Sequence, residues 1–182
     1  MQASESIEDA FAAISKAVLE GESGDVDILL FELILPRWEN EARLESLVDP
    51  ILAILDLAAT RENECGFHIF VRLEHIFCDI GAAGRAKIKS YVARHYGRFN
   101  GTVAAEMADF VGGFRDDWGL DVVESWIARA ETFTDDAAIW IGAALRELLD
   151  DSRGGLGEVR KARARTLEAR WREQCRGARH AP

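Results

Sequence analysis

Helical periodicity recurs along almost the whole chain and most limits what it can fold into. From Ile7 to Val18, apolar residues return at intervals of three and four, with Ser4 or Ser6 as cap and Gly21 just past the end. The same pattern predicts further helices over 26–35, 40–60, 63–80, 84–99, 102–114, 120–130 and 135–149. Pro50 removes a backbone donor, so we expect a kink or a new helix start capped by Asp49. The chain is therefore predicted to be all-α.

The predicted helices repeat at a nearly constant spacing. Similar patterns begin at Val26, Cys65, Val103 and Ala137, which are 39, 38 and 34 residues apart. The intervening helices recur as well, at 51–55, 88–92 and 122–127. One unit is a helix, a short turn and a second helix, and such a hairpin buries its apolar face only by stacking on neighbours. The predicted hairpins cover 7–35, 40–80, 84–114 and 119–149.

The unit length resembles that of HEAT or armadillo-type repeats. The small-residue second helix that ends Ile141-Gly-Ala-Ala-Leu-Arg-Glu-Leu is similar to such units, although the motifs are degenerate. The resemblance covers most of the chain up to residue 149. It implies a right-handed α–α superhelix of stacked antiparallel hairpins, followed by a basic C-terminal helix. An irregular helical bundle is the alternative arrangement of the same helices.

Charge divides the chain near Gly154-Gly155. The whole chain has 22 Lys+Arg against 32 Asp+Glu, a net charge of −10, yet residues 153–182 hold nine of the basic and only three of the acidic residues. We therefore predict an acidic body over 1–152 and a basic helix and tail over 153–182. Four apolar residues of this tail share one helical face: Leu156, Val159, Leu167 and Trp171. That face favours docking on the acidic body over a free nucleic-acid arm.

The sequence lacks motifs with catalytic or metal-ligand spacing. It has no Cys-x-x-Cys, no His-Glu-x-x-His, no Gly-x-Ser-x-Gly and no glycine-rich phosphate loop. We therefore predict no metal and no cofactor, and favour a non-enzymatic protein over an enzyme. The three cysteines are odd in number and unpatterned, which indicates reduced thiols in the cytosol. Cys78 is predicted to be a small core residue.

The best cluster of polar side chains lies on the helix predicted over 63–80. At about 100° per residue, His68, Arg72, His75 and Asp79 share one arc with Cys65. The two histidines are two turns apart, too far to ligate one metal, and Arg72 would repel a cation. The stripe is predicted to face solvent. A sharper alternative is contact with a partner, and a third is a small-ligand or enzyme site using His68, Arg72 and His75.

Three acidic doublets lie at predicted helix ends. Asp135-Asp136 begins a helix, where the dipole favours negative charge. The doublets Asp116-Asp117 and Asp150-Asp151 are predicted to follow helix C-termini and, in a solenoid, to form an acidic ridge that steers a basic partner. Trp118 beside the first of these is a candidate contact anchor. By contrast, Trp126 and Trp140 are predicted to be core residues.

Together these features predict a protein-binding module of the bacterial cytosol that binds a basic partner through a concave or acidic surface. A more specific alternative is an immunity protein that neutralises a basic toxin such as a nuclease, because small acidic folds resembling HEAT repeats occur among such proteins. Nucleic-acid binding is not expected, and the basic tail is the only candidate segment for it. The first residues are acidic and polar, so we expect no secretory signal. The sequence has no run of 18 apolar residues, so we expect no association with a membrane.

Overall fold

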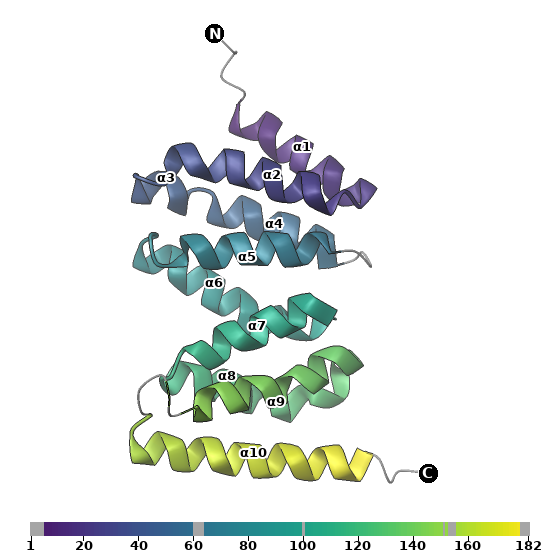
Figure 1. Cartoon of the computed structure of the whole chain (residues 1–182), viewed down its shortest axis with the longest axis vertical. Coiled ribbons are helices and arrows are strands. Elements are labelled where there is room, and N and C mark those ends of the chain that lie inside the picture. Colours follow the sequence, from purple (N-terminus) through teal and green to yellow (C-terminus); the bar gives the residue numbers. More distant parts are fainter. Residues whose placement is uncertain (1–5, 60–63, 100, 151, 153–155, 179–182) are drawn as a thin grey trace. The chain divides into compact units, whose positions relative to one another are not determined.

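The computed structural model describes residues 6–59, 64–99, 101–150, 152 and 156–178, and helices joined by short turns make up this part of the chain (Figure 1). No strand occurs among these residues, which confirms the all-α prediction. The chain divides into two compact units, Met1–Arg94 and His95–Pro182. This division falls inside the hairpin predicted over 84–114, whereas the predicted boundary at 152/153 lies within the second unit.

The first unit is built from paired helices. Its elements are α1 (Ile7–Glu20), α2 (Ser23–Ile34), the 3₁₀ turn η1 (Leu35–Arg37), α3 (Glu41–Glu45), α4 (Val48–Ala59), α5 (Cys65–Phe77) and α6 (Ala82–His95), which ends at the unit boundary. α1 packs against α2 and α4, and α5 packs against the same two helices. The second helix of the first pair therefore lies beside the second helix of the next pair.

Local sequence signals set the ends of these helices. The Ser6 side chain accepts a hydrogen bond from the Asp9 backbone nitrogen at 3.1 Å and so caps α1. Gly21 ends α1 with φ of 79°, a conformation that favours glycine. The predicted new start near Pro50 is confirmed, because α4 begins at Val48 and carries the proline in its first turn, but the prediction that Asp49 caps this helix is wrong, since the helix already includes Asp49. Asp49 lies in that turn, and its carboxylate forms an ion pair with Lys87 of α6.

The second unit packs around a buried aromatic stack. It contains the 3₁₀ turns η2 (Tyr96–Arg98) and η3 (Ala130–Thr132) and the helices α7 (Gly101–Gly113), α8 (Asp117–Arg129), α9 (Asp135–Leu149) and α10 (Glu158–Ala178). The rings of Tyr96 and Trp126 stack with centroids 3.7 Å apart, and both side chains are fully buried. The Tyr96 hydroxyl donates to the Ala137 carbonyl at 2.7 Å. Trp126 is thus a core residue as predicted, whereas Trp140 is only half-buried.

The basic helix α10 docks on α8 and α9. Leu156, Ala164, Leu167 and Trp171 are buried, but Val159 is 86% exposed, so its predicted place on the docked face is wrong. Arginines add ion pairs at the edge of this face: the Arg160 guanidinium lies 2.7 Å from Asp117, and that of Arg163 lies 2.7 Å from Asp121 and also contacts Glu124. The opposite charges of the tail and its surroundings therefore meet within one unit.

The predicted repeat coincides with a repeated pattern of burial. The four positions that begin the repeat are buried, and so are the residues four and eight positions later. These sets are Val26, Leu30 and Ile34; Cys65, Ile69 and Leu73; Val103, Met107 and Val111; and Ala137, Ile141 and Leu145. The recurrence in the sequence therefore records which face of α2, α5, α7 and α9 is turned inward.

Candidate functional site: an apolar face on α2

Only part of the polar stripe predicted on α5 faces solvent, and one of its residues is paired with α2. His75 and Asp79 are exposed, whereas His68 and Arg72 are half-buried. The Arg72 guanidinium donates two hydrogen bonds to the Asp27 carboxylate of α2, each 2.9 Å long. This paired geometry is the strong form of an arginine–carboxylate contact. Arg72 therefore links α2 to α5 and has its charge matched within the protein.

Two further side chains gather around this pair. His68 Nδ1 lies 3.7 Å from Asp27, and the Arg72 guanidinium lies over the Phe31 ring at 5.1 Å from its centroid. The structure thus brings His68 and Arg72 together with two α2 residues that the sequence analysis did not single out. Asp27 could have been noticed as a carboxylate inside an apolar segment, because such a residue needs a partner when its helix is packed.

Cys78 follows the end of α5 and does not belong to the core. It is the residue at the C-terminal cap of the helix, and its side chain is exposed. The prediction that it is a small core residue is therefore wrong. Its neighbour Phe77 is buried, so the change from interior to surface occurs within one residue at the helix end.

The outward side of α2 and the 3₁₀ turn η1 that follows it carry a row of exposed apolar side chains, with Ile28 and Phe31 in α2, Leu35 in η1 and Trp38 at its C-terminal cap. Ile28, Phe31, Leu35 and Trp38 are spaced by three, four and three residues, and their exposed fractions lie between 39% and 56%. We call these four residues the α2 stripe. The inward side of the same helix is also apolar, since Val26, Leu30, Leu33 and Ile34 are buried. A helix that is apolar on two opposite sides is typical of one covered on both, yet the described residues cover only one side of α2.

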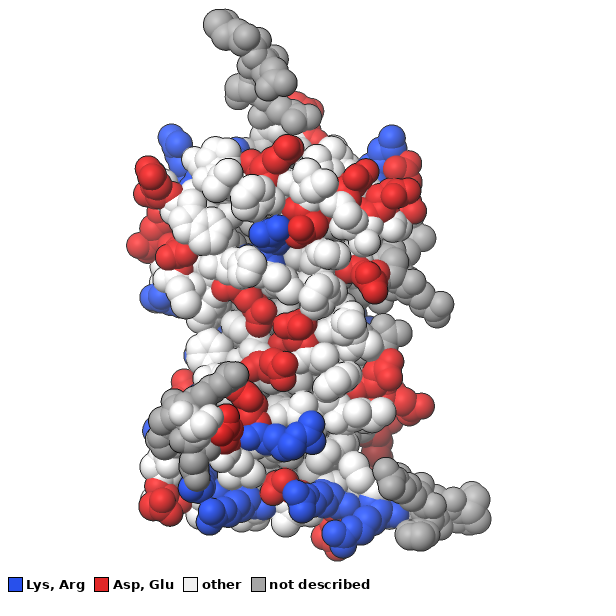
Figure 2. Space-filling view, in the orientation of Figure 1, with Lys and Arg blue, Asp and Glu red and all other residues white. Residues whose placement is uncertain are grey.

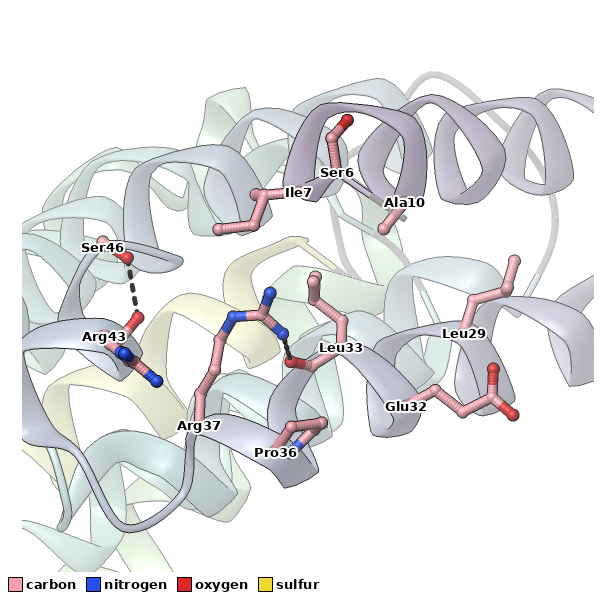
Figure 3. Close-up of a pocket in the computed structure, with 10 residues that line it drawn as sticks. All are labelled: Ser6, Ile7, Ala10, Leu29, Glu32, Leu33, Pro36, Arg37, Arg43 and Ser46. Atoms are coloured by element: carbon pink, nitrogen blue, oxygen red, sulfur yellow. Dashed lines mark hydrogen bonds between the residues drawn. The ribbon is translucent and has the colours of Figure 1, made fainter. Parts of the chain in front are cut away.

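An open cavity of about 460 Å³ lies between α1, α2 and α3, and none of the four α2-stripe residues lines it. Apolar side chains from α1, α2 and η1 form its walls, including Ile7, Leu29 and Leu33 (Figure 3). The Arg37 guanidinium projects between these walls and donates to the Leu33 carbonyl, while Arg43 lies at one side of the cavity. Such a cavity accepts an apolar side chain and offers guanidinium donors to a neighbouring carbonyl or carboxylate.

Acidic residues surround this surface. Residues 20–41 contain seven Asp and Glu and one basic residue, Arg37, and residues 1–94 hold seventeen acids against nine Lys and Arg. Figure 2 shows the same character, with uncharged surface over α2 and α5 set among acidic side chains and few basic ones. The first unit therefore combines an apolar patch with a net charge of −8.

The proposed acidic ridge is largely engaged in local structure. Asp116 caps α8 by accepting from the Gly119 backbone nitrogen at 3.0 Å, and Asp117 begins that helix and pairs with Arg160. The expectation that this doublet only follows a helix C-terminus is corrected, because the turn before α8 is very short. Trp118 is half-buried, with its ring edge-to-face on Phe110 and Phe114.

The second doublet gives a similar result where it is described. The Asp150 carboxylate accepts from the backbone nitrogen and hydroxyl of Ser152, and its carbonyl accepts from Arg115. Asp151 lies outside the described residues. Asp116, Asp117 and Asp150 are thus used as caps and ion-pair partners within the second unit.

In the described part of the chain, burial of side chains between helices raises the pKa of a thiol and of a carboxyl group. Burial raises the pKa of the Cys65 thiol, and burial with the neighbouring Asp109 raises the pKa of Glu106.

No group of three or more His, Cys, Asp or Glu is placed to hold a metal ion within the described part of the chain. Nor does any helix found there have both the length and the apolar character needed to cross a membrane.

No protein-family model matches this sequence, and neither a curated protein nor a solved structure gives a match.

Proposed function

We propose that this chain is a HEAT-like helical solenoid that acts as a protein-binding module, and that the α2 face is its docking surface. The single observation that carries this proposal is the exposed apolar row Ile28, Phe31, Leu35 and Trp38. Contiguous exposed apolar residues rimmed by polar ones are typical of protein interaction sites. The repeated burial along α2, α5, α7 and α9 supports the solenoid arrangement.

The expected partner has a basic surface with an apolar centre. Apolar anchors would fill the cavity beside Leu29 and Leu33 and cover the α2 stripe, since such anchors carry most of the binding energy in protein interfaces. The acids around α2 would attract a basic partner and mainly raise the association rate. Neutralisation of a basic toxin is one form of this function, and the acidity of residues 1–94 supports it.

The test compares the wild type with the double variant Ile28→Ser/Phe31→Ser. The matched control is Val159→Ser, which removes an exposed apolar side chain of the second unit that is 86% accessible. Proteins captured from an extract of the native host are identified, and the affinity of the purified partner for each variant is measured by calorimetry. We expect a basic protein that binds the control normally and binds the double variant at least about tenfold more weakly.

Equal binding to all three proteins, or capture of acidic proteins alone, would contradict the proposal. Circular dichroism of each variant checks that the fold is retained. For the toxin form, co-expression of the wild type with the captured partner should protect cells, whereas co-expression of the double variant should not.

A further inference from the structure

A second candidate binding surface lies in the second unit, between α9 and α10. Its charged residues are mainly basic, whereas those around α2 are mainly acidic. A groove of about 310 Å³ is lined by Ile139, Gly142 and Arg146 of α9 and by Trp171, Arg172 and Arg176 of α10. We call it the α9–α10 groove. It uses none of the residues of the α2 face.

The floor of the groove is apolar and is set by a glycine. A Cβ atom at Gly142 would lie 3.3 Å from Trp171 Nε1, so the absent side chain lets the indole rest against α9. Trp171 is only 8% exposed, whereas Ile139 next to the groove is 65% exposed. The groove therefore offers a buried aromatic wall and an uncovered aliphatic side chain to a ligand.

The rim carries surplus positive charge. Arg172 is paired with Glu168 at 2.6 Å, but among the described residues neither Arg146 nor Arg176 has an ion-pair partner. These arginines are not needed to dock α10, because the docking ion pairs are made by Arg160 and Arg163. Figure 2 shows Lys and Arg gathered along α10 in the lower part of the view.

We propose that the α9–α10 groove binds an acidic peptide segment that carries an apolar anchor residue. Arg176 of α10 and Arg146 of α9 both line the groove and can each pair with a carboxylate of the peptide, whereas Arg172 already pairs with Glu168. The anchor residue covers Ile139 and the edge of Trp171. The charge of this surface is complementary to carboxylates, so the partner differs from the basic one expected at α2.

The groove favours a peptide over a nucleic acid. Base stacking requires an open aromatic face, and the Trp171 indole is buried against α9. The exposed Ile139 adds apolar area that a phosphate backbone does not use.

The test uses the full chain and a fluorescein-labelled amphipathic peptide of about 18 residues, long enough to form helix, with Glu one turn apart and Leu between. A peptide with Lys in place of Glu and a thymidine oligonucleotide of about 20 nucleotides are the comparison probes. Anisotropy at low salt should show binding of the Glu peptide and not of the Lys peptide. Arg146→Glu/Arg176→Glu should weaken it at least about tenfold, and Arg170→Glu, outside the groove, should leave it within about twofold.

Cys175 supplies a readout at the site itself. Cys175 lines the groove and is half-buried, whereas Cys78 is exposed elsewhere. Saturating Glu peptide should slow iodoacetamide labelling of Cys175 and leave Cys78 unaffected, which decides the question in the wild type even where the double variant fails to fold.

Three results would overturn the proposal. They are an Arg170→Glu effect as large as that of the groove variants, no protection of Cys175, or tighter binding of the oligonucleotide with displacement of the peptide.

Discussion

At the scale of single residues, Tyr96 shows how one side chain fixes the core of the second unit. It is fully buried, stacks on Trp126 and donates a hydrogen bond to the Ala137 carbonyl. Burial raises the pKa of its hydroxyl, which keeps the group neutral and able to donate.

Tyr96→Phe should lower the free energy of unfolding by about 1 kcal/mol, because it removes the hydrogen bond and keeps the stack. Tyr96→Ala should cost about 3–5 kcal/mol, because it also opens a cavity against Trp126. Urea unfolding followed by circular dichroism measures both, and equal losses for the two variants would show that the hydroxyl, not the ring, dominates.

The thiols of Cys78 and Cys65 should differ in reactivity according to their burial. Cys78 is exposed and should react with Ellman's reagent in the native protein, whereas Cys65 is buried with a raised pKa and should react only on unfolding. Mass spectrometry of the labelled protein assigns each site. Rapid native labelling of Cys65 would contradict the position described for α5.

At the scale of elements, the attachment of α10 should depend on pH. The hydrogen bond from Arg160 lowers the pKa of Asp117 below its ordinary value of 3.8. A carboxyl group whose pKa is lowered by folding stabilises the folded form at pH above that value, and the contribution is lost as pH falls below it. The protection of the α10 amides against hydrogen exchange, relative to their intrinsic exchange rates, should therefore fall as the pH is lowered through the pKa of Asp117.

Asp117→Asn is the matched control for that experiment. It cannot titrate, so the acid-dependent part of α10 opening should shrink while the exchange of α7 is unaffected. The same pH dependence in the wild type and the variant would place the titrating group elsewhere.

The pair α7 and α9 depends on a close approach at Gly112. A Cβ atom there would lie 2.7 Å from Glu147 Cβ and 3.0 Å from the Ala144 carbonyl oxygen, whereas one at the next residue, Gly113, meets nothing within 4 Å. Gly112→Ala should therefore destabilise the protein by about 1–3 kcal/mol through overpacking. Gly113→Ala should be neutral or stabilising by up to about 1 kcal/mol, and thermal unfolding of the two variants compares them directly.

Element positions could be predicted where caps and periodicity agree. Helix α9 has the predicted bounds of 135–149, and α1 begins after Ser6, one of the two predicted caps, and ends at the predicted Gly21. The α2 stripe could not be predicted, because apolar residues on both sides of a helix do not reveal which side neighbouring helices leave open. The Asp116 cap could have been predicted from the sequence, because an aspartate just before an apolar helix is a common start signal.

At the scale of the whole molecule, charge is unevenly divided. Residues 1–94 carry a net charge of −8 and residues 95–182 a net charge of −2. Salt screens repulsion among the acids of the first unit, and it also screens the ion pairs that hold α10.

Raising the salt concentration from about 20 mM to about 300 mM, which shortens the screening length to a few ångströms, should slow hydrogen exchange in α1 and α2 and speed it in α10. Exchange measured by mass spectrometry resolves these helices within one sample. A uniform change across the chain would contradict the opposite electrostatic roles of the two regions.

The recurrence of similar helices along the chain could be predicted from the sequence, but the division of the chain into two units could not. The spacing of the segments at Val26, Cys65, Val103 and Ala137 corresponds to four helices with the same buried positions. The boundary at 94/95 depends on how many contacts cross between helices, which no local pattern encodes. The partner-binding surface depends in the same way on three-dimensional neighbours.

The bridge from Asp27 through Arg72 to Phe31 has a consequence for recognition. Because the Asp27 carboxylate holds the Arg72 guanidinium at two atoms and the guanidinium lies over the Phe31 ring, this member of the α2 stripe is already ordered before any encounter. Immobilising a flexible side chain on association costs about 0.5–1.5 kcal/mol. For Phe31 the loss of side-chain entropy has already occurred during folding. A binding protein therefore contacts a preorganised side chain and not a mobile one.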